Sequence, residues 1–194
     1  MISLRTVALD ETHHVQVGAL PEALVPDAAG FEALWALHPD SFHEIKMHGR
    51  LVRTPRWQQA YGADYRYTGS TNRALPLTPQ MDVWLGWARE HFDPRLNGLL
   101  FNWYDGAEGH YIGKHRDSDI NRVEGSPIVT FSFGEERVFR MRPWREKGFV
   151  DVPAVHAGVI VIPWDTNRAF THEVPAPKGA RGRRISVTIR GFYA

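Results

Sequence analysis

The second half of this sequence is a succession of short β-rich runs separated by turns. Beginning at Leu99, runs rich in β-branched and aromatic residues recur at 99–104, 110–115, 127–133, 137–142, 148–152, 157–162, 169–174 and 184–192. Short strands at such regular spacing are typical of a barrel or a sandwich. We therefore expect an α+β chain that is mainly β, whose strands form a double-stranded β-helix, or jelly roll.

The first half of the sequence adds helices and a hairpin to this predicted core. The segment from Val25 to Leu37 repeats apolar residues at helical spacing. Thr78 followed by Pro79 is a start signal for a second helix, because threonine caps helix N-termini and proline suits the first turn. Residues 44–54 predict two short strands joined by a turn. We expect the helices to buttress one sheet of the jelly roll.

Nothing in the sequence divides the chain. It has 194 residues, enough for one sizeable core, and it contains no internal repeat, low-complexity tract or linker. We expect a single domain over residues 1–194, in which 1–97 form an extension with the supporting helices and 98–194 form the β core. No apolar run approaches about 18 residues and no signal-peptide core is present. We therefore expect a soluble, cytoplasmic protein without a membrane segment.

Composition limits the chemistry that the chain can support. There is no cysteine, which excludes a disulfide framework and a thiolate-ligated metal, and leaves histidine and carboxylate as metal ligands. The formal net charge is +1, so the chain has no global basic field. Local basic clusters lie within residues 46–56, 137–147 and 178–184. Such clusters can neutralise phosphates, and they can equally be solvated strand faces.

One set of residues is a strong candidate for binding a metal. His115 and Asp117 form a His-x-Asp pair, and alternate side chains of an extended segment project to one side. His172 follows His115 by 57 residues. Two imidazoles and one carboxylate form the 2-His-1-carboxylate triad, which suits Fe(II) and leaves coordination positions open for substrates. The alternative is that the pair of His115 and Asp117 arises by chance and that His172 is a satisfied strand histidine. The two other His-x-Asp pairs, which begin at His38 and His91, we expect to be chance matches.

Two arginines near the end of the chain are candidates for binding a carboxylate. Arg184 and Arg190 lie in the run R-I-S-V-T-I-R, six residues apart, so on a regular strand they share a face. A guanidinium can meet a carboxylate with two parallel charge-assisted hydrogen bonds. The alternative is a pair of exposed strand arginines, and Arg181 and Arg183 compete for the same role.

In this order, these elements resemble the AlkB family of iron- and 2-oxoglutarate-dependent dioxygenases. The resemblance adds the N-W-Y of residues 102–104 and the second acid of H-R-D-S-D, and it covers roughly residues 45–192. It implies a jelly-roll fold, with Fe(II), 2-oxoglutarate and O2 as cofactors. The implied reaction is oxidative demethylation of alkylated bases in DNA, such as 1-methyladenine and 3-methylcytosine, with release of formaldehyde, succinate and carbon dioxide.

The resemblance also implies roles for single residues. The metal ligands would be His115, Asp117 and His172. Arg184 would bind the distal carboxylate of 2-oxoglutarate with help from Tyr104, and Arg190 would lie near the metal end with Asn102. Ser186 stands where members of the family often carry asparagine.

The segment of residues 45–69 resembles the family's nucleotide-recognition lid, and its P-R-x-Q-x-x-Y-G pattern resembles the branch that prefers duplex DNA. An enzyme that acts on a base in a duplex must flip the base out and stack it. The residues predicted to contact the substrate are Arg56, Gln58, Tyr61, Tyr65, Tyr67, Met47, His48 and Asp119. Met47 and His48 stand where that branch has a finger that fills the gap left by the base. Asp119 would accept a hydrogen bond from an exocyclic amine, or else cap a turn.

Two other interpretations stay open. An oxygenase of the same chemistry could act on RNA, protein or a small molecule, in which case the lid would be a plain hairpin with core aromatics. A jelly-roll binding module could share the fold without catalysis, and iron-dependent succinate production would exclude it. The expected partner is alkylated DNA, or RNA, and the expected state is a monomer.

Overall fold

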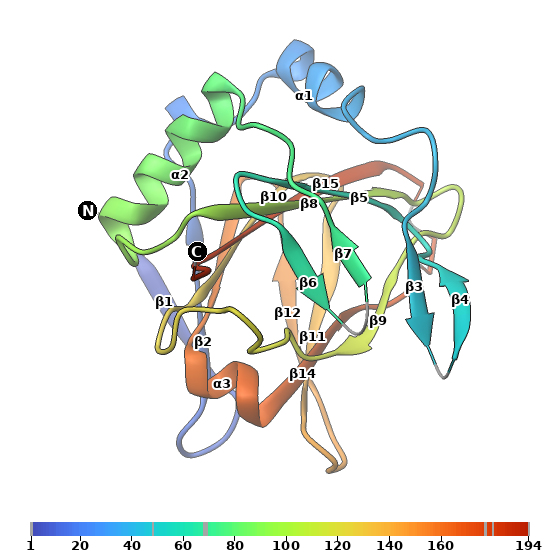
Figure 1. Ribbon diagram of the computed structural model, residues 1–194. Coiled ribbons are helices and arrows are strands. Elements are labelled where there is room, and N and C mark those ends of the chain that lie inside the picture. The colour runs from blue at the N-terminus through green and yellow to red at the C-terminus, as the bar shows by residue number, and fades with distance from the viewer. Residues whose placement is uncertain (1, 48, 68–69, 177, 180, 194) are drawn as a thin grey trace.

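Two facing antiparallel sheets dominate the computed structural model, which describes residues 2–47, 49–67, 70–176, 178–179 and 181–193 (Figure 1). The larger sheet has seven strands in the order β1-β2-β13-β10-β15-β8-β5. These strands are β1 (Leu4–Ala8), β2 (His14–Ala19), β5 (Trp57–Tyr61), β8 (Gly98–Asp105), β10 (Ile128–Gly134), β13 (Gly158–Ile162) and β15 (Arg183–Arg190). The smaller sheet has the order β12-β11-β14-β9. Its strands are β9 (Ile112–His115), β11 (Arg137–Pro143), β12 (Val150–Ala154) and β14 (Phe170–Val174). This mainly β arrangement confirms the predicted fold class.

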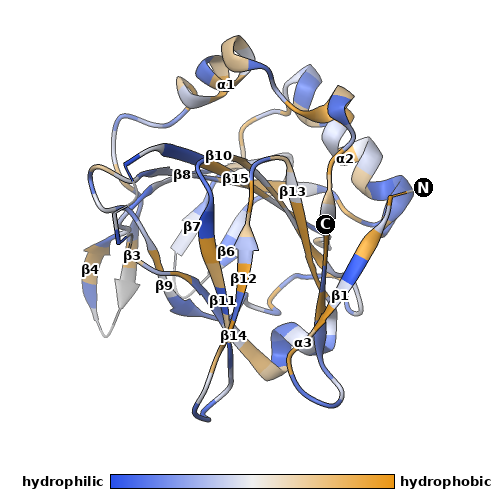
Figure 2. Ribbon diagram, turned by 180° about the vertical axis from the view of Figure 1, so that it is seen from behind, coloured by the Kyte–Doolittle hydropathy of each residue, from blue (hydrophilic) through white to orange (hydrophobic). Residues whose placement is uncertain are grey.

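Two helices cover the outer face of the larger sheet, as the sequence predicted (Figures 1 and 2). The first, α1 (Ala28–Trp35), is shorter at both ends than the predicted helix of residues 25–37. Its N-terminus is fixed by the carboxylate of Asp27, which caps the first turn. A single 3-10 turn (Glu22–Leu24) precedes it. The second, α2 (Pro79–His91), begins at Thr78, whose hydroxyl caps the first turn.

The face of the larger sheet that meets the helices is an apolar core. The buried stripe of α2 consists of Met81, Trp84, Leu85 and Ala88, spaced as one face of a helix. Trp84 stacks on Phe133 of β10 with 5.1 Å between ring centroids. The indole N–H of Trp84 donates to the carbonyl of Leu24 at 2.8 Å, and that of Trp103 donates to the carbonyl of Leu34 at 2.9 Å. The polar atoms of these two large side chains are therefore satisfied.

The inner face of the same sheet carries a buried polar stripe. On β15 the residues that face the helices are Ile185, Val187 and Ile189, and those on the inner face are Arg184, Ser186, Thr188 and Arg190. This division follows from the alternation of side chains along a strand. Elsewhere the inner face packs on the smaller sheet through apolar residues such as Ile128 and Ile160 against Phe139 and Met141. Burying polar groups is costly unless they have partners, so the stripe marks the candidate site.

Two hairpins and a short helix flank the sheets. They are β3 (Glu44–Met47) with β4 (Arg50–Arg53), β6 (Tyr65–Tyr67) with β7 (Ser70–Asn72), and α3 (Trp164–Ala169). The β3–β4 pair confirms the predicted hairpin, and all residues of β4 are exposed, so this hairpin stands away from the sheets (Figure 1). In the described part of the chain, no helix has the length and apolar character needed to span a membrane.

Candidate metal and cosubstrate site

The three predicted metal ligands converge at one end of the smaller sheet. His115 on β9 and His172 on β14 are register partners, and their ring centroids are 4.3 Å apart. Asp117 follows His115 in the next extended segment, and its Oδ1 lies 3.7 Å from His115 Nε2 and 3.9 Å from His172 Nε2. One ligand atom from each residue lies within 4.8 Å of the other two. Strand pairing thus brings together residues that are 57 positions apart in the chain.

The two other His-x-Asp pairs lie elsewhere. His38 stacks on Trp57 with 4.2 Å between ring centroids. His91 stacks on Trp87, and its Nδ1 lies 2.8 Å from the backbone carbonyl of that residue. Both rings are occupied by packing contacts, as expected for bystander histidines.

Neighbouring side chains fix the orientation of the ligands. Arg190 binds Asp117 Oδ2 through Nε and Nη2, both at 2.6 Å. The Tyr65 hydroxyl donates to Asp117 Oδ1 at 3.2 Å. Asn167 of α3 accepts from the backbone N–H of Asp117 and donates to its carbonyl. The Nδ1 of His115 meets the Gly113 carbonyl at 2.8 Å, which assigns its proton there and leaves Nε2 free to bind a metal.

The electrostatics of the site leave the ligands in the protonation state that a metal requires. Burial alone would raise the pKa of Asp117, but the charges of Arg190, His172, His115 and Arg122 together outweigh this effect and hold the pKa well below its usual range. Burial, and then the neighbouring His115, lowers the pKa of His172 to about 3, and burial also lowers the pKa of His115. Two neutral imidazoles and one carboxylate are therefore available at neutral pH. This donor set fits Fe(II).

A buried arginine provides the complementary feature for a carboxylate. Arg184 is 1% exposed, and its Nη2 donates to Ser132 Oγ at 2.9 Å. Among the described residues, its Nε and Nη1 are buried without a hydrogen-bond partner. The guanidinium carbon lies 5.0 Å from the ring centroid of Tyr104, the register partner of Arg184 on β8. Burial lowers the pKa of Arg184, as expected for a cation that lacks a counter-ion. These unpaired donors fit the distal carboxylate of a 2-oxoacid.

The other predicted cosubstrate residues lie along the same face. Asn102 pairs in register with Ser186, and both are buried. The side-chain carbonyl of Asn102 accepts from Arg56 Nε at 2.7 Å, and Arg56 also donates to Gln58 at 3.0 Å. Arg56 and Gln58 are both buried in the site. Because Arg56 donates to the amide oxygen of Asn102, the amide nitrogen of Asn102 points the other way and can donate to another group.

The residues predicted to contact the substrate occupy different places. Asp119 has a side chain that is 49% exposed, with Oδ2 4.0 Å from Arg168 Nε, and the described hydrogen bonds give it no role as a turn cap. Tyr65 contacts the metal ligand Asp117, as described above, and its ring lies under Arg190. His48 lies outside the described residues, as do the side chains of Met47 and Tyr67.

The prediction that Tyr61 contacts the substrate is wrong, because this residue is buried in the apolar core. Tyr61 is register partner to Leu99 and packs edge-on against Phe101, in the apolar core on the helix side of the sheet. Its place at the end of β5 directs the ring away from the inner face, so it does not reach the metal ligands.

The basic cluster of residues 137–147 is divided by strand alternation. Arg140 binds Asp151 and Arg142 binds Glu173, so the charges of both arginines are compensated on the outer side of β11. Arg137 instead points inward, is 5% exposed, and keeps Nη1 buried without a partner among the described residues. Arg137 was not among the residues predicted from the sequence to lie in the site, although its spacing from Phe139 and Met141 places it on their face of the strand.

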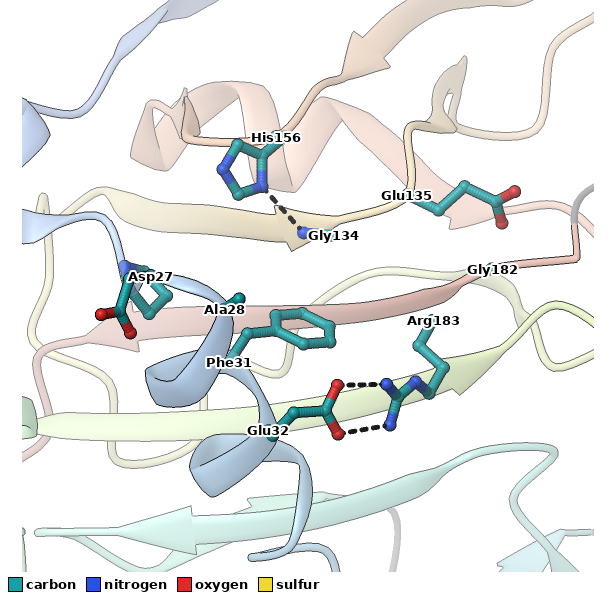
Figure 3. Close-up of a pocket in the computed structure, with 10 residues that line it drawn as sticks. Asp27, Ala28, Phe31, Glu32, Gly134, Glu135, His156, Gly182 and Arg183 are labelled. Atoms are coloured by element: carbon teal, nitrogen blue, oxygen red, sulfur yellow. Dashed lines mark hydrogen bonds and ion pairs between the residues drawn. The ribbon is translucent and has the colours of Figure 1, made fainter.

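One surface depression of the protein is separate from this site. It has a volume of about 640 Å³ and lies between α1 and the turn at Gly134 (Figure 3). Glu32 and Arg183 within it form an ion pair, and His156 Nδ1 accepts from the N–H of Gly134 at 3.1 Å (Figure 3). It contains none of the metal ligands, so the depression is not the candidate site.

Comparison with known proteins agrees with this donor set. The family model described as "2OG-Fe(II) oxygenase superfamily" matches residues 34–190. The DNA oxidative demethylase ALKBH2 of Homo sapiens is 29% identical over 162 residues, which cover 75% of this chain and 60% of that protein. The alpha-ketoglutarate-dependent dioxygenase alkB homolog 3 of Rattus norvegicus is 28% identical over 150 residues, which cover 72% of this chain and 50% of that protein. The chain thus spans less than two thirds of the length of either relative.

A solved structure supports the fold alone. The structure titled "The structure of OsALKBH1" matches with a TM-score of 0.61 and 15% sequence identity, and the match covers 96% of this chain and 100% of that one.

Proposed function

We propose that this chain, which belongs to the 2OG-Fe(II) oxygenase superfamily, is an oxidative demethylase of alkylated bases in DNA. Membership of the superfamily implies Fe(II), 2-oxoglutarate and O2 as cofactors, as the sequence predicted. The predicted resemblance to the AlkB family is confirmed by the two curated relatives. The observation that carries the proposal is the His-Asp-His set at the smaller sheet together with Arg184 on the inner face of the larger sheet, a buried arginine with two nitrogens that lack a partner among the described residues.

The residues of the chain hold and orient the reacting groups. When bound, Fe(II) and 2-oxoglutarate activate O2 and hydroxylate the methyl group, which leaves as formaldehyde while 2-oxoglutarate becomes succinate and carbon dioxide. His115, Asp117 and His172 hold the metal, and Arg190 keeps Asp117 ionised and fixed. Arg184 binds the distal carboxylate, which sets the direction of the cosubstrate relative to the metal.

Asp119 favours cationic bases as substrates. Its carboxylate lies two residues beyond the ligand Asp117 and is half-exposed, so a base entering the site can reach it. Methylation at N1 of adenine or N3 of cytosine leaves a positive charge on the base, which a carboxylate stabilises. This supports 1-methyladenine and 3-methylcytosine as the preferred lesions.

The exposed β3–β4 hairpin supports a nucleic acid substrate. Leu51 is 72% exposed, and Val52 beside it is also exposed, although large apolar side chains are usually buried. An apolar side chain on a protruding hairpin can fill the gap that a flipped base leaves in a duplex. We expect Leu51→Ser to slow demethylation of duplex DNA several-fold while leaving single strands almost unaffected. Equal loss on both substrates would show that the hairpin is not such a finger.

The proposal is tested with methylated oligonucleotides. Single- and double-stranded oligonucleotides that carry 1-methyladenine or 3-methylcytosine are incubated with Fe(II) and 2-oxoglutarate, and formaldehyde and succinate are measured together. We expect equal amounts of both products from wild-type protein and from a His91→Ala control, and neither from His172→Ala. Succinate without formaldehyde from every oligonucleotide would contradict the proposal and favour an RNA, protein or small-molecule substrate. Action as a monomer in the cytoplasm stays a prediction from the sequence.

A further inference from the structure

The site contains more buried positive charge than its acidic residues can balance. The buried arginines are Arg56, Arg122, Arg137, Arg184 and Arg190. Among the described residues, only Asp93 and Asp117 are acidic side chains buried to the same degree, and Asp93 binds Arg95 elsewhere. A buried cation without a partner costs free energy, because its charge has lost the stabilisation that water gives. Such an excess indicates that the folded site is completed by an anion.

Three of these arginines have side-chain carbonyls or carboxylates of the protein near their charge. Arg190 binds Asp117, and Arg56 donates to two side-chain carbonyls, those of Asn102 and Gln58. Arg122 donates to the carbonyl of Ser126 and lies over the ring of Trp164, 4.8 Å from its centroid. Its Nε and Nη1 are also buried without a partner among the described residues, but the carboxylates of Asp117 and Asp119 favour its charged form. The remaining pair, Arg137 and Arg184, comes from opposite sheets.

Both members of the remaining pair lie against the same ring. The guanidinium carbon of Arg184 is 5.0 Å from the centroid of Tyr104, and that of Arg137 is 5.9 Å from it. Arg137 Nη2 donates to the backbone carbonyls of His110 and Pro175 at 2.9 and 3.1 Å, which fixes the guanidinium in place. Its Nη1 is buried without a partner among the described residues, as are Nε and Nη1 of Arg184.

No carboxylate of the described residues forms an ion pair with either arginine of this pair. Tyr104 and then Glu135 favour the charged form of Arg137, but no described ion pair joins Glu135 to Arg137. Burial lowers the pKa of both arginines, and the charge of Arg137 further lowers the pKa of Arg184. Two cations that destabilise each other at the same aromatic ring are stabilised together when an anion lies between them.

The position of Arg137 along β11 matches the length of the cosubstrate. Phe139 of the same strand stacks on the metal ligand His172, with 5.3 Å between ring centroids. Arg137 is two residues farther along on the same face, which is roughly 6.8 Å of strand. This separation matches the length of a five-carbon dicarboxylate that has one end at the metal.

We infer that Arg137 is a second cosubstrate-binding residue, so that the distal carboxylate of 2-oxoglutarate is held between Arg137 and Arg184 beside Tyr104. The inference rests on the proposed function for the identity of the cosubstrate. Each guanidinium meets one side of the carboxylate, whose single negative charge is shared between them and balances one of the two buried positive charges. The second cation selects for 2-oxoacids that carry a distal carboxylate.

The test is binding of 2-oxoacids without turnover. Mn(II)-loaded protein is titrated calorimetrically, without O2 and without nucleic acid, with 2-oxoglutarate and with 2-oxobutyrate, which lacks the distal carboxylate. Arg137→Gln should weaken 2-oxoglutarate binding about ten- to thirtyfold and leave 2-oxobutyrate binding unchanged. Arg140→Gln is the matched control, since it removes a charge from the outer side of the same strand, and it should change neither affinity.

Two results would overturn the inference. One is an affinity of Arg137→Gln for 2-oxoglutarate within twofold of wild type. The other is an equal loss for both 2-oxoacids, which would make Arg137 a purely structural link between β9 and β14. If Arg137→Gln does not fold, Arg137→Lys takes its place, because it keeps a charge but cannot reproduce the fork, and it should again weaken binding of 2-oxoglutarate alone.

These experiments can refute the role of Arg137 and the proposed demethylation of DNA independently of each other. Selective loss of 2-oxoglutarate affinity in Arg137→Gln supports the role of Arg137 even if no methylated oligonucleotide releases formaldehyde. Conversely, formaldehyde release by wild-type protein with unchanged cosubstrate affinity in Arg137→Gln overturns the inference and leaves the proposed function intact.

Discussion

The two faces of the seven-stranded sheet are built by the same strands and differ in what they bury. Toward the helices, β8, β10 and β15 present aromatic and branched aliphatic side chains, and the indole N–H groups of Trp84 and Trp103 find backbone carbonyls. Toward the smaller sheet, β15 presents arginines, and Arg184 keeps two nitrogens without partners among the described residues. Burial on the outer face lowers the free energy of the fold, whereas burial on the inner face raises it until ligands bind.

Because of this difference, alternate residues of one strand contribute either to the stability of the fold or to ligand binding. Neighbours such as Arg184 and Ile185 are equally buried, yet one points into the site and the other into the helix-covered core. Substitutions on the inner face should change ligand binding with little loss of stability, and substitutions on the outer face should do the opposite. The predictions below test this separation.

The largest effect is expected at the metal ligands. His172→Ala should abolish turnover, because substitution even of groups that only support a ligand typically costs about 10- to 100-fold in metal affinity or activity. The protein should stay folded, since His172 contributes no hydrogen bond through its buried Nδ1 among the described residues. Metal binding and circular dichroism measure the two properties. Loss of metal in a His91→Ala control, or retained metal in His172→Ala, would overturn the assignment of the triad.

The opposite outcome is expected for the outer face. Trp84→Ala removes a fully buried indole that stacks on Phe133, and it should lower the free energy of unfolding by about 3–5 kcal/mol. Val83→Ala, at an exposed position of the same helix, should change it by less than about 0.5 kcal/mol. Urea denaturation gives both values. If folded Trp84→Ala lost its affinity for Mn(II), the two faces would not be separable.

Those parts of the molecule that depend on local periodicity were predictable from the sequence. The His-x-Asp spacing put His115 and Asp117 on one side of an extended segment, and the structure brings His172 to them. The spacing of Arg184 and Arg190 predicted a shared face, which is the inner face of β15. In each case the predicted arrangement depends only on residues that are close in sequence: the His-x-Asp motif in the first case, and a single strand in the second.

The side of the sheet to which a given side chain points could be determined only from the structure. Strand alternation separates Arg137 from Arg140 in the sequence, but only the packing of the smaller sheet against β8 shows that Arg137 points to Tyr104. Tyr61 and Tyr65 look equivalent in the sequence. They fall on different strands, so one ring enters the apolar core and the other contacts Asp117. Tertiary pairing, which local patterns do not encode, decides these positions.

An intermediate effect is expected at the distal end of the inner face. Arg184→Lys keeps the charge but removes the planar fork, and it should weaken 2-oxoglutarate binding by on the order of 2 kcal/mol, or about thirtyfold. Arg183→Lys is the matched control, because Arg183 is the preceding residue of the strand and binds Glu32 on the surface. The Michaelis constant for 2-oxoglutarate is the measurement. An unchanged constant in Arg184→Lys would refute the role of this arginine.

The smallest effect is expected at Asp93, a buried carboxylate just after α2 whose partner, Arg95, is already present. Its carboxylate accepts from the backbone N–H and the guanidinium of Arg95, and these hydrogen bonds hold the pKa of Asp93 below its usual value although burial opposes them. A carboxyl group with a lowered pKa in the folded state adds stability above its unfolded pKa of about 3.9, and that stability is lost as the pH falls through the folded value.

Asp93→Asn should therefore lower the free energy of unfolding by about 1 kcal/mol at pH 7, and the gap to wild type should shrink below about pH 4. Urea denaturation of the metal-free proteins at pH 7, 5 and 3.5 gives the gap. Burial holds the pKa of His172 at about 3, so both proteins lose stability as the pH falls below about 6.5, but this loss is common to both and cancels in the difference. A gap that stayed constant or widened on acidification would show that Asp93 is not stabilised by its charge. Asp93 could then no longer serve as the example of a buried charge that its partner stabilises, to be compared with the arginines of the inner face.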